Sequence, residues 1–131
     1  MATTMGFRIE GADVPAIASA AITKGIVVTL TSDSSAGDRR VAVCGTSDIP
    51  FGVALDDIAS AESGSIRTEG VALVSSNGAF TIGDELCVAA ADGQVDTLSA
   101  DGWSVGQALH GAGGADELVP CKIRIHYHNV P

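Results

Sequence analysis

Aromatic residues are scarce in this sequence of 131 residues. They make up only 4% of the chain, although 46% of it is hydrophobic, so most apolar side chains are small. Small apolar side chains suit thin, closely packed β layers and are poor at enclosing a large ligand pocket. This scarcity argues against a ligand-binding enzyme. It also argues against a carbohydrate-binding site, which usually presents an aromatic platform.

Positive charge is also in short supply. Seven Lys and Arg residues face sixteen Asp and Glu residues, giving a formal net charge of -9. The basic residues are scattered along the chain and form no cluster. Nucleic-acid binding depends on neutralising phosphates with Lys and Arg, so DNA or RNA is excluded as a partner.

Cysteine motifs and long apolar runs are absent as well. Cys44, Cys87 and Cys121 are widely spaced, each within an apolar stretch, and no CxxC occurs. Free cysteines in such positions are expected to be buried as small hydrophobes. The N-terminus does not resemble a signal peptide, and no apolar run approaches the roughly 20 residues of a membrane span. We therefore expect a protein made in a cytoplasm-like compartment, without membrane contact.

What the sequence does contain is short β-branched runs separated by turn residues. Asn-Gly and Asp-Gly pairs supply the positive φ angles of tight hairpins, and their spacing is typical of a sandwich or barrel. We predict strands over residues 26–31, 40–44, 51–55, 65–68, 71–75, 86–90, 94–97, 104–109 and 118–127. The prediction is an all-β, single small sandwich or barrel-like domain over residues 16–131, preceded by an extended N-terminal arm over residues 1–15. Only residues 13–21 and 57–62 are candidates for short helices, and the second equally suits a loop.

The chain also repeats itself imperfectly. Residues 24–28 and 82–86 each place a glycine turn before a strand. Residues 51–55 and 105–109 share the pattern of an apolar residue followed by Gly-x-Ala-Leu. We interpret this as one β unit used twice within one domain, which is a property of a scaffold and indicates no chemistry.

One motif resembles a catalytic site. Residues 102–106 match the G-x-S-x-G nucleophile elbow around Ser104, and Asp116 and then His126 or His128 follow in hydrolase order. The elbow requires a buried strand before the serine and a helix after it. Here a polar, turn-like stretch precedes Ser104 and a strand pattern follows it. We therefore predict no catalytic residue and no enzyme activity.

The sequence also contains weak candidates for metal and cofactor sites. His126 and His128 lie on one face of the last strand and could ligate zinc or nickel, but spacing identifies no third ligand. A solvated or interface-facing strand end is the favoured interpretation. Three acidic pairs beside turns are expected to be solvated: Asp56-Asp57, Asp84-Glu85 and Asp116-Glu117. The Gly-rich residues 111–114 lack the Lys-Ser/Thr of a phosphate loop. We predict no metal and no cofactor.

The order of these weak motifs carries a resemblance to a known family. The stretches "AITKGIVVTL", "PFGVALDDIASAESGSIRTEGVALV" and "AFTIGDELCVAAADGQVDTLSADGWSVGQALHGAGGADELVPCKIRIH" resemble tailed-phage capsid decoration (cement) proteins, formerly a domain of unknown function. The likeness covers about residues 16–126. It departs at the cysteines and in the tail that starts at His126.

The resemblance implies a β-rich homotrimer on the outer surface of a phage head, with the major capsid protein as partner and no active site. In the N-terminal arm, Phe7 and Ile9 are candidate apolar anchors beside Arg8, and these three residues are the predicted contacts with the capsid or a neighbouring subunit. The alternative is a carbohydrate- or tail-associated β binding module.

Overall fold

A computed structural model describes residues 11–31, 39–89 and 92–129 of the chain. These residues form nine strands and no helix. The strands are β1 (Gly11–Ala18), β2 (Val27–Thr31), β3 (Arg40–Val43), β4 (Gly52–Ala54), β5 (Ser63–Ser75), β6 (Glu85–Val88), β7 (Val95–Thr97), β8 (Gly102–Ala108) and β9 (Leu118–His128). The all-β prediction is confirmed.

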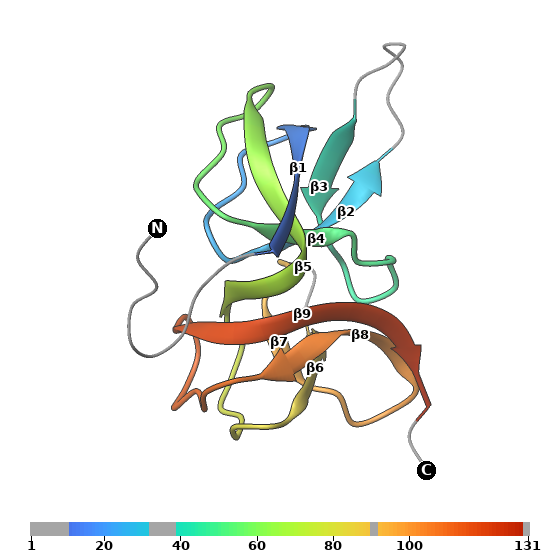
Figure 1. Cartoon of the computed structure of the whole chain (residues 1–131), viewed down its shortest axis with the longest axis vertical. Coiled ribbons are helices and arrows are strands. Elements are labelled where there is room, and N and C mark those ends of the chain that lie inside the picture. Colours follow the sequence, from blue (N-terminus) through green and yellow to red (C-terminus); the bar gives the residue numbers. More distant parts are fainter. Residues whose placement is uncertain (1–10, 32–38, 90–91, 130–131) are drawn as a thin grey trace.

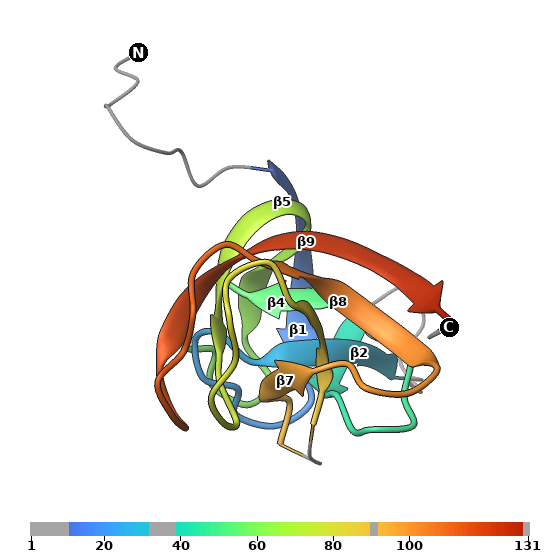
Figure 2. The ribbon, with the colours of Figure 1, turned by 90° about the horizontal axis from the view of Figure 1, so that it is seen from below.

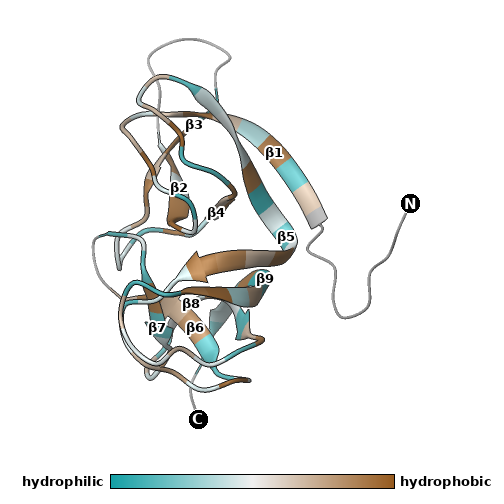
Figure 3. Cartoon of the chain, turned by 90° about the vertical axis from the view of Figure 1, so that its left-hand side faces the viewer, coloured by the Kyte–Doolittle hydropathy of each residue, from teal (hydrophilic) through white to brown (hydrophobic). Residues whose placement is uncertain are grey.

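The strands join in one sheet with the order β1-β3-β2-β4-β5-β9-β8-β6-β7, and β1 also pairs with β5. The long strand β5 runs through two groups of strands: β1 to β4 lie around its upper part in Figure 1, and β6 to β9 lie at and below its lower end. Seen after a turn of 90°, the sheet curls into a barrel-like wall (Figure 2). Hydrophobic and hydrophilic residues alternate along β1 (Figure 3), as expected for a strand with one face in a core.

The internal repeat is confirmed by matching backbone hydrogen bonds. The N–H of Gly25 donates to the carbonyl of Ala54 at 3.0 Å, and the N–H of Gly83 donates to the carbonyl of Ala108 at 2.8 Å. Both glycines have positive φ, +87° and +92°, as the turn before β2 and β6 requires. We call residues 11–68 the first repeat and residues 69–129 the second repeat, so that β5 is divided between them.

Bridges outside the strands repeat as well. Ile22 pairs with Ile58 in the first repeat, and Phe80 pairs with Ala112 in the second, both antiparallel. The parallel pairing of Ala18 with Val41 is matched by a parallel bridge between Ser76 and Val95. One backbone architecture is therefore built twice from sequences that share few side chains.

Each repeat has its own core. The first repeat buries Ala16, Ala18, Ile22, Ile26, Val28, Val41, Ala54, Ile58 and Ile66. The second buries Ala72, Val74, Phe80, Leu86, Val88, Val95, Val105, Ala108, Ala112, Val119, Cys121 and Ile123. Val27, Cys44 and Val53 come from the first repeat but pack into the second core. These three side chains join the repeats into one folded unit.

Both helix candidates are wrong. Residues 13–18 lie in β1, which pairs with β5 in an antiparallel register, and Ala16 and Ala18 are buried in alternation. Residues 57–62 form a turn in which Ala61 has a φ of 68°, a left-handed conformation that no right-handed helix contains. Pairing with distant segments decides both, β5 for the first and the bridge from Ile22 to Ile58 for the second.

Candidate functional site

The predicted contact residues Phe7, Arg8 and Ile9 lie outside the described residues. The structure does show where the N-terminal segment joins the domain, because β1 begins at Gly11 opposite Gly70 of β5. Residues 11–15, expected in the arm, form part of β1 and pair with β5.

An apolar surface lies over β2 and the segment before β4. It surrounds a groove of about 350 Å³ that is lined by Thr29, Leu30, Ile49, Pro50 and Phe51. Leu30 and Ile49 are 54% and 58% exposed. The hydroxyl of Thr29 donates to the carbonyl of Ile49 at 2.8 Å, which holds the two segments together. Exposed apolar surfaces of this kind are typical of contacts with other proteins.

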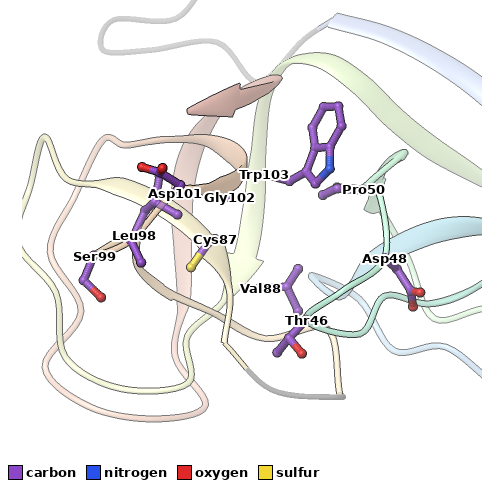
Figure 4. Close-up of a pocket in the computed structure, with 11 residues that line it drawn as sticks. Thr46, Asp48, Pro50, Cys87, Val88, Leu98, Ser99, Asp101, Gly102 and Trp103 are labelled. Atoms are coloured by element: carbon purple, nitrogen blue, oxygen red, sulfur yellow. The ribbon is translucent and has the colours of Figure 1, made fainter. Parts of the chain in front are cut away.

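A second hollow, a cleft of about 180 Å³, lies between the repeats. Figure 4 shows side chains of both repeats around it: Cys87, Val88 and Trp103 come from the second repeat, and Thr46 and Asp48 from the first. The cleft is too small to enclose an extended ligand.

The aromatic residues beside this cleft do not form a flat platform. The rings of Trp103 and Tyr127 lie 5.6 Å apart at 88°, an edge-to-face contact. Two rings at right angles offer a sugar no shared flat surface, so this arrangement does not favour the carbohydrate-binding alternative.

The cysteines offer no activated nucleophile. Burial raises the pKa of the Cys44 and Cys121 thiols to about 12, so both stay protonated. Burial and the neighbouring Asp96 also raise the pKa of Cys87, which is half-buried. All three thiols are free, and full burial is confirmed for Cys44 and Cys121.

Ser104 does not sit in a nucleophile elbow. It lies inside β8, is fully buried, and donates its hydroxyl proton to Oε2 of Glu85 at 2.5 Å. His126 is the cross-strand neighbour of Ser104, but the carboxylate and not the imidazole accepts the serine proton. The serine of a Ser-His-Asp triad needs a hydrogen-bonded imidazole and access to substrate, and Ser104 has neither.

Asp116, the acid of the hydrolase order, lies apart from this serine. Its carboxylate accepts a hydrogen bond from the amide of Gln94 at 2.6 Å, in a turn where Asp116 has a φ of 64°. The serine, the acid and the histidine of the motif therefore do not come together as a catalytic triad.

His126 and His128 do lie together, and the structure adds a third group that sequence spacing missed. Glu85 of β6 joins them, with one ligand atom of each residue within 4.8 Å of the others. The sequence carries no local signal for Glu85, because only the strand order β6-β8-β9 brings the start of β6 near the end of β9.

The comparisons with known proteins bear on the whole of this fold. A family model for the phage cement protein matches residues 8–123, which include the first repeat and most of the second. The chain belongs to the phage cement protein family. No curated protein sequence matches it. Among solved structures it is similar to the head fiber gp8.5 N base of bacteriophage phi29, with a TM-score of 0.70 and 16% identity over 86% of this chain and 93% of that chain.

At 16% identity this neighbour shows the fold alone. Family membership supports a capsid-associated structural role for this cement protein and a place in the virion. In the part of the chain that the structure describes, no helix is long and apolar enough to cross a membrane.

Proposed function

We propose that this cement protein binds the outer surface of a phage head and stabilises the capsid lattice, without enzymatic activity. The observation that carries the proposal is the family match over residues 8–123, which spans the first repeat and most of the second. The partner is the major capsid protein, and the binding form is a homotrimer.

Charge supports the outer surface as the binding side. The formal net charge of -9 opposes contact with packaged DNA, which is itself a polyanion. A protein that sits outside the shell avoids this repulsion. A trimer that contacts several capsid subunits gains attachment strength through effective concentration, so each single contact need not be strong.

We assign the contact with the capsid or with a neighbouring subunit to the N-terminal arm. Phe7 and Ile9 are apolar anchors beside Arg8, and an extended segment of this kind can add to the edge of a partner's sheet. The contact would be made just ahead of β1, whose pairing with β5 anchors the arm to the domain.

The test is to mix the purified protein with undecorated heads of its own phage. Co-sedimentation with the heads and a higher temperature of DNA release are expected, because a ligand that binds only the intact lattice stabilises that lattice. A variant lacking residues 1–10 keeps β1 complete and is expected to fold normally but bind heads weakly. A protein that stays in the supernatant and leaves the release temperature unchanged contradicts the proposal.

The absence of enzymatic activity has its own test. Ser104→Ala is expected to leave any esterase activity of a preparation unchanged, because the buried hydroxyl donates to Glu85 and is not available to a substrate. Loss of a reproducible hydrolase activity on this single change would overturn the non-enzyme proposal.

A further inference from the structure

The cluster of Glu85, His126 and His128 has the composition of a metal site. Its three ligand atoms, one from each side chain, lie within 4.8 Å of one another, and Nε2 of His126 is 3.8 Å from Oε2 of Glu85. Ligands at about 2.0–2.2 Å from a tetrahedral zinc ion are roughly 3.3–3.5 Å apart. Small rotations of half-buried side chains close the difference.

Neighbouring groups already orient two of the ligands. Nδ1 of His126 lies 2.9 Å from the carbonyl of Arg124, so this nitrogen donates its proton and Nε2 keeps its lone pair toward Glu85. The hydroxyl of Ser104 donates to Oε2 of Glu85 and holds the carboxylate beside the imidazole. Hydrogen bonds of this kind, from ligand to backbone carbonyl and from hydroxyl to carboxylate, are the usual second layer of a metal site.

Alternation along β9 places the histidines on the outer face of the sheet, and a bulge in the β8–β9 pair brings Ser104 opposite His126. Gly106 lies opposite Ile123 and Ser104 lies opposite His126, so β9 has one residue more than β8 between these pairs. Val105 is part of the second core and Ile125 packs against it. Since side chains alternate along a strand, His126 and His128 point away from that core, where an ion from solvent can reach them.

We propose that Glu85, His126 and His128 bind one divalent transition-metal ion, with zinc as the physiological occupant. Two neutral imidazoles and one carboxylate form a donor set that suits zinc, whereas calcium and magnesium require oxygen ligands. The three ligands leave a fourth position for water. The ion would tie the start of β6 to the end of β9.

One group opposes the metal. A guanidinium nitrogen of Arg124 lies 3.7 Å from Oε1 of Glu85, and the Arg124 side chain is 57% exposed. The Arg124 side chain can rotate into solvent when a cation binds, because losing a surface ion pair costs little free energy. Replacing it with a neutral residue is therefore expected to tighten metal binding.

The experiment is calorimetric titration of untagged, chelator-treated protein with Zn²⁺ alone. The wild type is expected to bind one ion per chain. His126→Ala and His128→Ala are each expected to weaken binding at least tenfold, and Glu85→Gln is expected to act in the same direction. His110→Ala is the matched control. His110 is the remaining histidine of the chain, and it lies exposed in the turn after β8, outside the cluster.

Two further variants separate a metal site from a structural contact. Arg124→Gln is expected to tighten zinc binding about two- to fivefold, an effect that loss of a stabilising ion pair alone would not produce. Cys87→Ser is expected to leave zinc binding unchanged, which excludes the half-buried thiol as the ligand. Co²⁺ in place of zinc is expected to give the visible absorption of a four-coordinate site in the wild type but not in His126→Ala.

Three results would overturn the inference: no saturable zinc binding by the wild type, equal binding by the His126→Ala/His128→Ala double variant, or equal loss in His110→Ala. Circular dichroism of each variant checks that the fold is kept. Zinc is expected to raise the melting temperature of wild type and of the variants that keep the ligands, and to leave that of the His126→Ala/His128→Ala double variant unchanged. These measurements use the free protein, so their outcome is independent of binding to heads.

Discussion

The two repeats share a backbone, yet the equivalent faces of their strands differ in chemistry. Val27 pairs with Val53 in the first repeat, and at the same register Glu85 pairs with Gln107 in the second. Both valines are fully buried, because this face of the first repeat packs into the core of the second. Gln107 is exposed and Glu85 half-exposed, because no third repeat covers their face among the described residues.

This comparison shows that a tandem duplication creates one covered face and one free face from the same architecture. The covered face keeps small apolar residues, whereas the free face is open to polar and charged residues. The candidate metal cluster lies on the free face, where the first repeat has Val27 at the position of Glu85.

A second difference lies at Arg67 and Lys122, which hold equivalent positions opposite Val53 and Gln107. Arg67 is buried and its guanidinium donates to both carboxylate oxygens of Asp13, at 2.7 and 3.1 Å. It also donates to the carbonyl of Val71 at 2.7 Å.

Lys122 is exposed, because its antiparallel partner at that register is Val71 and not an acid. The same backbone pairing therefore supports a buried ion pair in one repeat and a solvated charge in the other.

The largest expected effect tests whether the shared backbone is what both repeats need. A Cβ at Gly52 would overlap the carbonyl of Arg67, and a Cβ at Gly106 would overlap the carbonyl of Lys122. Gly52→Ala and Gly106→Ala are each expected to destabilise the fold by about 3 kcal/mol or more, measured by urea unfolding.

Gly83→Ala is the control for the glycine comparison. Gly83 has positive φ but no atom within 4 Å of the added carbon. Its cost is expected to be about 1–2 kcal/mol, from backbone strain alone. Equal stability of Gly52→Ala and the wild type would break the equivalence of the two repeats.

The next effect sharpens the contrast between the ion pair and the solvated lysine. Asp13→Asn is expected to cost about 1–3 kcal/mol at pH 7, because it weakens the charge-assisted bonds of a buried guanidinium. Lys122→Met is expected to leave the melting temperature unchanged, since Lys122 is exposed at the equivalent register.

The pH dependence of the Asp13 effect follows from its pKa. The hydrogen bond from Arg67 holds the pKa of Asp13 below its ordinary 3.8, against a smaller opposing effect of burial. A lowered folded-state pKa gives stability that is present above pH 3.8 and is lost as pH falls through the folded-state value. Urea unfolding at pH 7 and below pH 3 is expected to show the difference between wild type and Asp13→Asn shrink. A difference that is constant with pH would mean that the pair contributes no charge effect.

The smallest effect concerns the three thiols. Alkylation of native protein with iodoacetamide at pH 8, followed by mass spectrometry, is expected to modify Cys87 before Cys44 and Cys121. Cys87 lines the cleft, whereas the other two are fully buried with pKa values of about 12. Simultaneous modification of all three thiols would indicate global opening and not local access.

Local sequence signals predicted most of the strands. The Asn-Gly and Asp-Gly turns and the β-branched runs marked β2 to β9 within a few residues, because turn geometry and alternation depend on near neighbours. They missed β1, whose sequence includes Pro15 and alanines and becomes a strand because β5 and β3 pair with it. They also divided β5 in two, although the chain continues through Gly70 at a φ of 108°.

The sequence by itself determined the class of the fold, the duplicated unit and the family resemblance, since these depend on residue order and composition. Only the tertiary structure decided which strand faces are covered and which side chains from distant segments meet. Glu85 joins His126 and His128 because β8 lies between β6 and β9 in the sheet and a bulge sets the register of β8 on β9, with Ser104 opposite His126. No local pattern contains that information, because strand pairing between distant segments depends on how the whole chain closes its cores.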